Sequence, residues 1–421
     1  MTQPVFVHAA DLHLGAPLNQ LGKTLSPEIR KNLLILAPKA FTNLIDLTIN
    51  RDAEFLILAG DIYDRADREP AAQFAFRTQM DRLNEKNIKV YIVHGNHDPT
   101  SDDLSEYVKL PSNVKVFGPN SEEVVTHVLR DGSKVLVAGI SYWQKAVTEN
   151  LVPRLSAIVN KVERDDIRAI IGILHTNVDS PEHEKYAPCS VSDLQTSPFD
   201  YWALGHVHKR SINEIGLHRY WAYPGNLQGR FFKEEGSKGA LVIPIQTTGV
   251  GLPEHVACDV FRFLHLHIDC TEFPAEDLPS EISQRCLEQI PDSDSRPIVV
   301  RLRLFGTSTV VEEKLSEIGE PVLAVELSNA LSSHLYGGGI DRIEIDVQPE
   351  IDIDALKNTD TIIADVINAL EKDDLIALIN EQLKDIKSQV VLSPERLKEI
   401  HAKMQKNMIK DLYSNSSAPK S

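Results

Sequence analysis

Cysteine is scarce in this chain: 421 residues contain only four, and no two of them form a Cys-x-x-Cys pair. This scarcity argues against a disulfide framework and against a zinc site built from thiolates. A membrane-spanning helix is not expected, because no apolar run approaches the roughly 20 residues that cross a bilayer. The first residues also lack a basic segment followed by a long apolar one, the pattern of a secretory signal. We therefore expect a cytoplasmic protein that does not enter a membrane.

Positive charge is also in short supply, since the net charge is −17 at pH 7. The deficit is concentrated in residues 258–350, which carry 7 Lys and Arg against 18 Asp and Glu. Residues 1–257 are nearly balanced, with 27 Lys and Arg against 31 Asp and Glu. An acidic chain binds nucleic acid poorly on its own, because affinity for polyanions comes from Lys and Arg. Any nucleic-acid function would need a partner that supplies basic surface.

Residues 1–257 alternate short aliphatic runs with longer amphipathic stretches, which is typical of an α/β fold built in layers. The runs are apolar throughout, as expected of strands that are buried on both faces. Helices are expected over Arg30–Ile49 and Ala71–Glu85. The predicted strands are Val5–Ala9, Phe55–Ala59, Val90–Val93, Val135–Ile140, Ala169–Leu174 and Tyr201–Leu204.

The sequence pattern changes near residue 258. Residues 258–350 predict a small acidic α+β domain, and residues 351–421 carry apolar residues at helical spacing, which indicates a helical tail. We therefore expect three parts, with the functional site in the domain of residues 1–257. The strands predicted for the small domain are Phe261–Asp269, Pro297–Leu304 and Ile340–Val347.

Polar residues with metal-binding side chains directly follow five of the predicted strands. In an open α/β sheet, ligands bind outside the carboxyl ends of the strands. One Asp-x-His pair has little specificity, but five such motifs, each at a strand end, indicate a metal site. The residues concerned are Asp11 and His13, Asp61 and Asp64, Asn96, His97 and Asp98, His175, and His206 and His208.

The donor atoms predict two divalent ions, because carboxylates, imidazoles and one amide oxygen suit Mn²⁺, Fe²⁺ or Zn²⁺ and disfavour Ca²⁺. Mn²⁺ is the ion we favour. Asp61 is the natural bridge, since one carboxylate has two oxygens and can bind both ions. Two ions roughly 3.5–4 Å apart activate a water and hold the attacking and leaving oxygens of a displacement at phosphorus.

These motifs resemble those of the calcineurin-like metallophosphoesterases, and most closely the bacterial DNA-repair exonuclease branch of the SbcD and YhaO type. The closer match rests on residues 8–15, on His175-Thr176-Asn177-Val178 and on residues 223–230, Tyr-Pro-Gly-Asn-Leu-Gln-Gly-Arg. The resemblance is strong over residues 1–245, looser over the small domain and faint in the tail. It implies a layered sheet core with helices outside, followed by an α+β capping domain.

The resemblance also implies a role for each matching residue. His97 would protonate the leaving oxygen and Asp98 would orient it, while Asp64 would have a supporting role. Some nuclease relatives carry a histidine at the position of Asp64. One metal would be bound by Asp11, His13, Asp61 and His208, and the other by Asp61, Asn96, His175 and His206.

Basic residues follow the last metal motif, between residues 209 and 238. They could form an ordinary charged surface or a strip that contacts a phosphate backbone. The residues that we expect to bind substrate are Arg230, Lys209, Arg210 and Asn226. Two pairs of histidines have simpler interpretations: His8 and His94 at the ends of apolar runs are expected to be structural, and His265 and His267 to share one face of a strand.

The combined prediction is a metal-dependent DNA nuclease subunit, with exonuclease or endonuclease activity in DNA repair or processing. By analogy with the resembled nucleases, the tail would bind an SMC-like ABC ATPase of the SbcC type, although it could instead pack on its own chain; a homodimer is a further option. The main alternative is a small-molecule phosphatase, phosphodiesterase or pyrophosphatase, because the motifs serve the reaction centre and not the leaving group. A structural subunit with an unimportant metal site is disfavoured, since buried carboxylates without metal are costly.

Overall fold

The computed structural model describes residues 3–350 apart from 19–20, 22–23, 65–69, 101–107, 120–122, 180–185, 275 and 292–293, and describes Ala364 beyond them. The predicted helical tail therefore lies, except for that residue, outside the described part of the chain. Within this part, every helix is too short or too polar to pass through a membrane.

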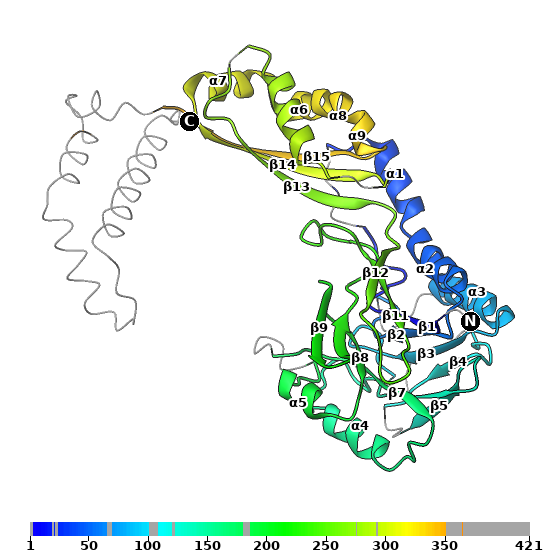
Figure 1. The fold of residues 1–421 in the computed structure, drawn as a ribbon. Coiled ribbons are helices and arrows are strands. Elements are labelled where there is room, and N and C mark those ends of the chain that lie inside the picture. Colours follow the sequence, from blue (N-terminus) through cyan, green and yellow to red (C-terminus); the bar gives the residue numbers. More distant parts are fainter. Residues whose placement is uncertain are drawn as a thin grey trace, which may run out of the picture.

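Two six-stranded sheets form the centre of the larger domain (Figure 1). The first has the order β12 (Glu254–Ala257), β11 (Gly239–Pro244), β1 (Val5–Ala9), β2 (Phe55–Ala59), β3 (Lys89–Val93) and β4 (Val114–Val116). The second has the order β5 (Val124–Val128), β6 (Lys134–Gly139), β7 (Ile167–His175), β8 (Tyr201–Gly205), β10 (Arg219–Tyr223) and β9 (Ser211–Gly216). The expected fold class, an α/β core in layers with helices outside, is confirmed, but the core contains two sheets.

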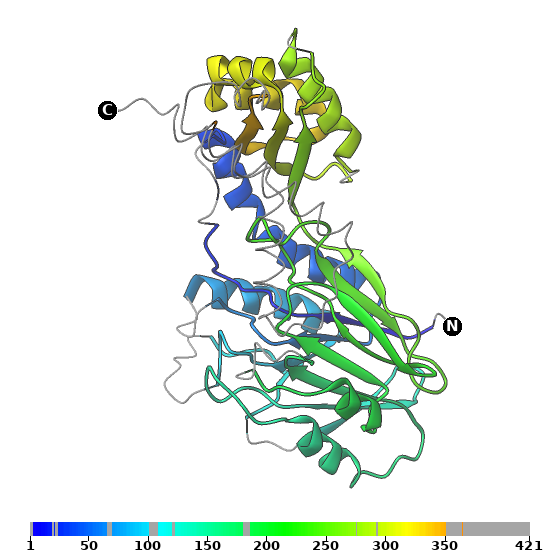
Figure 2. The same cartoon turned by 90° about the vertical axis from the view of Figure 1, so that its left-hand side faces the viewer.

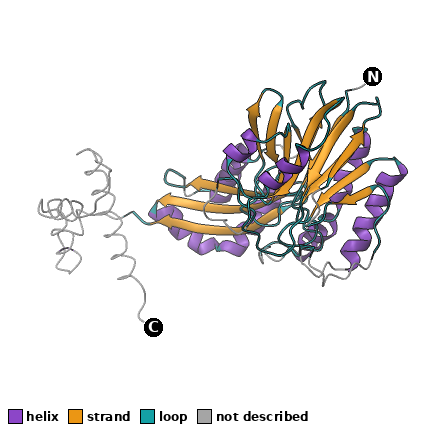
Figure 3. Ribbon diagram, turned by 90° about the horizontal axis from the view of Figure 1, so that it is seen from below, coloured by secondary structure: helices purple, strands orange, loops and turns teal. Residues whose placement is uncertain are grey.

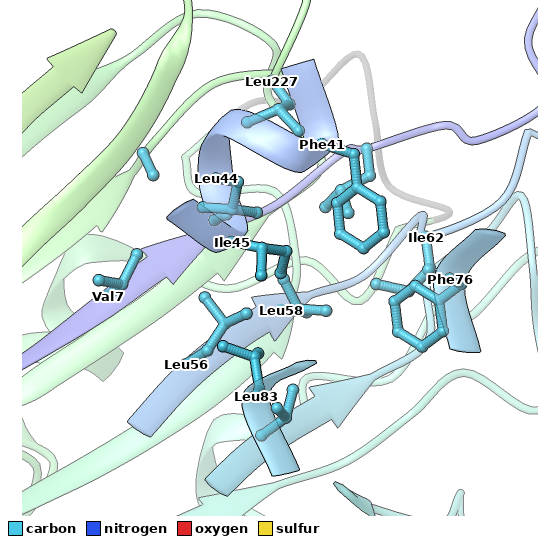
Figure 4. Close-up of a cluster of buried hydrophobic side chains, with 14 of the residues drawn as sticks. Val7, Phe41, Leu44, Ile45, Leu56, Leu58, Ile62, Phe76, Leu83 and Leu227 are labelled. Atoms are coloured by element: carbon cyan, nitrogen blue, oxygen red, sulfur yellow. The ribbon is translucent and has the colours of Figure 1, made fainter. Parts of the chain in front are cut away.

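The apolar strands are buried on both faces because each sheet packs between the other sheet and a layer of helices (Figure 3). In β2, Phe55 and Ile57 face the second sheet, and the ring of Phe55 stacks on Phe6 of β1 with centroids 5.0 Å apart. Leu56 and Leu58 face the opposite way and pack beneath the helices (Figure 4). This alternation explains the continuous apolar runs in the sequence.

The helices form the outer layers. α2 (Lys39–Asn50) and α3 (Pro70–Glu85) cover the first sheet, whereas α4 (Val152–Val159) and α5 (Val191–Thr196) cover the second. The single helix expected over Arg30–Ile49 is divided, since α1 (Pro27–Leu36) ends before Pro38 and α2 begins after it. Proline causes the break because its ring occupies the space of a helical neighbour and it has no N–H to donate.

A third sheet of three parallel strands belongs to the small domain, in the order β13 (Arg262–Asp269), β14 (Ile298–Thr307) and β15 (Gly339–Gln348). Four helices pack on one of its faces: α6 (Leu278–Gln289), α7 (Thr309–Ile318), α8 (Glu320–Ala330) and α9 (Ser332–Leu335). The other face carries His265 and His267, which do share one face, paired in register with Arg301 and Arg303 of β14.

The two domains are joined by more than the chain connection at residue 258. α1 extends from the larger domain along the small one (Figure 2), and its Leu33 packs with Phe261 and Phe263. Phe232, from the loop after β10, joins the same cluster, and the guanidinium of Arg301 lies 3.7 Å from its ring centroid. A loop near the predicted metal site is thus anchored in the small domain.

Candidate active site

The metal-binding motifs converge at the carboxyl ends of strands from both sheets. β1, β2 and β3 of the first sheet lead to Asp11, Asp61 and Asn96, whereas β7 and β8 of the second lead to His175 and His206. Three overlapping groups have potential ligand atoms within 4.8 Å of one another. These groups are Asp11, His13 and His208; Asp11, Asp61 and His175; and His13, Asp61 and His97.

Glycines allow the two sheets to approach each other at this point. A Cβ on Gly205, at the end of β8, would overlap the carbonyl oxygen of Ala59 in β2. A Cβ on Gly60 would overlap the ring of His175, and the φ of Gly60 is +91°. The glycines of the Gly-Asp and Gly-His motifs are therefore needed for close packing, so that the side chains beside them meet.

Several candidate ligands have strained backbones. Asp11, His13, Asp61 and His206 have φ values of 52°, 45°, 49° and 104°, in the left-handed region that non-glycine residues rarely adopt. Hydrogen bonds hold this conformation, for example from the Asp11 amide to the Gly60 carbonyl and from the His13 amide to the Asp61 carbonyl. Such strain costs about 1–3 kcal/mol per residue and gathers at functional sites, where it fixes side-chain direction.

His13 and His208 are arranged as ligands of a single ion. Their Nε2 atoms are 3.1 Å apart, and Nδ1 of His208 donates to Oε1 of Glu234 over 2.6 Å. Burial lowers the pKa of His13 to about 4, so its ring is neutral at pH 7. Two Nε2 atoms this close to each other could bind one cation between them. The separation is about that of two nitrogens that bind one ion at roughly 2.1 Å.

His175 and Asp61 form a second set of donors. Nδ1 of His175 donates to the Ala59 carbonyl at 3.1 Å, which directs its Nε2 towards Oδ1 of Asn96 at 2.9 Å and Oδ2 of Asp61 at 3.4 Å. The same Asp61 oxygen lies 3.9 Å from Nε2 of His13. Asp61 is therefore placed between the two sets, as a bridging carboxylate must be.

The buried acids provide an electrostatic reason for metal binding. Burial, and then the charge of Asp61, raises the pKa of Asp11 well above its usual range. A divalent cation would remove this penalty, because it favours the ionised form of both carboxylates. The residues present thus fit two divalent ions. His206 is in none of the three described groups, but its ring lies 5.2 Å from that of His175 and its amide donates to Asp11.

The expected pairing of Asp98 with His97 requires correction. Asp98 is fully buried and accepts hydrogen bonds from Nδ1 of His94 at 2.9 Å and from the amides of Ile62 and Gly95. Nδ1 of His97 donates instead to the backbone carbonyl of Asp64 at 2.9 Å. Successive side chains in this turn point in different directions, so Asp98 stabilises the loop beneath His97. The structural roles expected for His94, and for His8 beside Tyr201, are confirmed.

Arg230 and Asp64 form an ion pair beside the candidate ligands. Nη1 of Arg230 lies 2.5 Å from Oδ1 of Asp64, and that oxygen is 3.4 Å from Nδ1 of His13. The hydrogen bond with His13, and then the charge of Arg230, lowers the pKa of Asp64 below its usual range. Asp64 thus supports His13 through its side chain and His97 through its carbonyl.

Glu234 is a functional residue that the sequence analysis missed. It is only 6% exposed, and it accepts hydrogen bonds from His208, from the side chain of Asn226 and from the amide of Arg230. Burial raises its pKa, but these donors outweigh burial and lower the pKa to about 2. A carboxylate behind a ligand histidine fixes the tautomer and the direction of the ring. No local motif signals this residue.

The substrate-binding role expected for Asn226 requires correction. Its side chain is fully buried and donates to Glu234 and to the Gln228 carbonyl, so it supports the loop. Lys209 and Arg210 are exposed. Lys209 lines a cavity of about 640 Å³ together with His206 and His208.

We predict that Glu234→Gln weakens metal binding by roughly 10- to 100-fold, the usual effect of removing such a partner. The amide retains the shape of the side chain but offers His208 a weaker acceptor. Calorimetric titration of the metal-free chain with Mn²⁺ measures the effect. Glu235→Gln is the matched control, since this neighbour is exposed and pairs with His265. Equal affinity of the two variants would mean that Glu234 has only a structural role.

Comparison with known proteins agrees with this geometry. Residues 4–210 match the model of a family described as calcineurin-like phosphoesterase. Over 313 residues, 73% of each protein, the chain is 31% identical to a Bacillus subtilis (strain 168) protein named uncharacterized metallophosphoesterase YhaO. It is 29% identical over 221 residues to the DNA double-strand break repair protein Mre11 of Methanococcus maripaludis, covering 50% of this chain and 53% of that protein.

A second protein of that name, from Archaeoglobus fulgidus, is 28% identical over 256 residues, covering 55% of this chain and 52% of its own length. The chain belongs to the calcineurin-like phosphoesterase family. It is accordingly a metallophosphoesterase, a hydrolase of phosphate esters, and the resemblance found in its motifs is confirmed.

Proposed function

We propose that the chain is a DNA nuclease subunit that cuts phosphodiester bonds during repair or processing of DNA. The observation that carries the proposal is the cavity beside His206 and His208. Its lining includes three lysines, and its two glutamates are both engaged, Glu234 with His208 and Glu235 with His265. A phosphodiester within a polynucleotide needs room on both sides of its phosphorus and cations for the neighbouring phosphates, whereas a small monoester has neither a second substituent nor neighbouring phosphates. The names of the two Mre11 relatives, which concern repair of DNA breaks, point the same way.

The candidate ligands would divide between two ions. Asp11, His13, Asp61 and His208 would bind one, and Asp61, Asn96, His175 and His206 the other. When bound, two divalent ions, preferably Mn²⁺, supply an activated water and neutralise charge on the phosphoryl oxygens.

His97 would be the general acid. The Asp64 carbonyl accepts the Nδ1 proton of this ring, so the proton that the ring would transfer is one on Nε2. Once Nε2 has given its proton to the leaving oxygen, the neutral ring keeps the Nδ1 proton that the carbonyl stabilises. A group that holds one tautomer in this way makes proton transfer directional.

The proposal is tested with the purified full chain and Mn²⁺, Fe²⁺ or Zn²⁺ in turn. The substrates are linear duplex DNA, single-stranded DNA, a chromogenic phosphodiester and a chromogenic phosphomonoester. We expect cleavage of the phosphodiester and of DNA, with the highest rate in Mn²⁺. Rapid hydrolysis of the monoester without any cleavage of DNA would refute the nuclease and favour the small-molecule phosphatase.

We further propose that the tail of residues 351–421 binds an SMC-like ABC ATPase of the SbcC type, on the resemblance and on the charge distribution. The small domain carries 7 Lys and Arg against 18 Asp and Glu, so a partner with basic surface would raise DNA affinity. Whether the full chain forms a homodimer is measured separately by sedimentation.

A chain that ends at Glu350 should therefore fail to co-purify with the ATPase and should not gain duplex cleavage from it. Its hydrolysis of the chromogenic phosphodiester should be unchanged, because every candidate ligand precedes residue 209. The measurement is duplex cleavage against salt concentration, with and without the ATPase. If the shortened chain still binds the partner, the tail has no role in docking.

A further inference from the structure

The cavity beside the candidate metal site has an aromatic side chain in its lining. Its lining combines His206 and His208 with Lys209, Phe231, Lys233 and Lys238. Glu234 and Glu235 also line it, and they are engaged with His208 and His265. Its volume of about 640 Å³ lies within the roughly 300–1,000 Å³ of ligand-binding sites and can hold a nucleotide. A chromogenic ester would use only the part near the histidines.

Phe231 is held in place from both sides along the chain. The next residue, Phe232, is 3% exposed and packs against Phe263 of the small domain with centroids 4.4 Å apart. The buried Glu234 carboxylate accepts a hydrogen bond from the backbone amide of Phe231 and another from His208. The ring of Phe231 itself remains partly exposed at the cavity. Its position relative to the candidate ligands is therefore fixed without its ring being used in the core.

Two cations flank this ring. The guanidinium carbon of Arg230 lies 5.3 Å from the ring centroid, and Nζ of Lys233 lies 5.9 Å from it. A partly exposed aromatic ring beside cations in an open cavity resembles the arrangement with which proteins bind single-stranded nucleic acid, where rings stack on bases and cations contact phosphates.

We propose that Phe231 stacks on a base next to the scissile phosphate, and that Lys209 and Lys233 contact the flanking phosphates. The inference rests on the proposed nuclease function and specifies its substrate: a single strand, or a duplex end whose terminal bases have separated. A base in a closed duplex already stacks on its neighbours and is not free to meet Phe231.

The test compares a complete single strand with a set of strands that each lack one base. The abasic residue takes the place, in turn, of each of the three nucleotides on either side of the cleaved bond. The Mn²⁺-loaded full chain should cut the complete strand roughly 5- to 150-fold more efficiently, by kcat/KM, than the strand lacking the stacked base. In Phe231→Ala this ratio should fall to about one, and in Phe231→Trp it should persist.

Phe273→Ala is the matched control, because Phe273 is also partly buried beside an arginine but lies in the small domain. Its ratio should equal that of the wild type. The stacking role is overturned if Phe231→Ala slows every strand equally, or if no abasic position affects the wild type. A wild type that hydrolyses the chromogenic phosphodiester but cuts no strand would overturn the proposed nuclease function, and this inference with it.

The lysines are tested by salt dependence. Lys233→Ala should make the slope of log affinity for a single strand against log salt shallower by about 0.7, the contribution of one phosphate contact. Lys89→Ala, at the opposite, amino-terminal end of β3, should leave the slope unchanged. An unchanged slope in Lys233→Ala would contradict the proposed phosphate contact.

Discussion

Asp61→Asn is expected to abolish phosphodiester hydrolysis, with a loss on the order of 10³-fold or more, because metal ions contribute several kcal/mol to the transition state. Oδ2 of Asp61 faces both His13 and His175, so this one side chain serves both sets of donors. Asparagine offers a single neutral oxygen, which cannot bridge two cations. The bound metal, counted by elemental analysis, should fall together with the activity.

Asp61→Asn should also change thermal stability, raising the Tm of the metal-free chain and reducing the increase in Tm that metal causes. In the metal-free chain it removes the repulsion between Asp61 and the buried Asp11, so the variant should unfold at a higher temperature than the wild type. Addition of Mn²⁺ should raise the Tm of the wild type but barely that of the variant.

Asp52→Asn is the control, since Asp52 also has a positive φ, of 48°, but pairs with Arg130 at the surface. It should retain activity and metal response. An active Asp61→Asn chain with two metals bound would refute the assignment of the bridge.

The candidate ligands could be predicted from the sequence because each directly follows a strand that is recognisable as a short, continuous apolar run. β1 and β2 have the predicted bounds, since each is a short run without a polar interruption except His8. Parallel strands with buried faces leave polar side chains only at their ends. Asp11 and Asp61 therefore had to lie at one edge of a sheet, whatever the rest of the fold.

Long-range pairing could not be predicted in the same way. β1 pairs with β11, although more than 200 residues separate the two strands along the chain. Nothing in the sequence of the strands specifies that those carrying the motifs divide between two sheets. Glu234 was missed for the same reason, because its partner His208 precedes it by 26 residues and the two meet only in space.

The direction in which individual side chains point could not be predicted from the sequence either. Asp98 adjoins His97 in the chain, yet its oxygens accept from His94 and from backbone amides. Asn226 lies in a stretch that resembles a nuclease motif, but it is fully buried and donates to Glu234. In both cases a backbone group of the loop needed a partner: amides donate to Asp98, and the Gln228 carbonyl accepts from Asn226.

His97→Ala is expected to lower kcat for DNA by about 10²–10⁴-fold, the usual contribution of a general acid, while two metals remain bound. The loss should be much smaller for a phosphodiester with a nitrophenolate leaving group, because such an anion departs without a proton. The measurement is kcat for a series of esters against the pKa of the leaving alcohol. The wild type should depend weakly on that pKa and the variant steeply.

Metal content distinguishes this role from a second one that the geometry permits. A ring nitrogen of His97 lies within 4.8 Å of donors from His13 and Asp61, a spacing that a ligand could also have. If His97 were a ligand, His97→Ala would lose metal and would slow all esters equally. His97→Gln retains a donor for the Asp64 carbonyl but has no proton to give, so it should fail as His97→Ala does. Recovery of the rate in His97→Gln would mean that His97 only supports the loop. His218→Ala, in the turn before β10, controls for the loss of a histidine elsewhere.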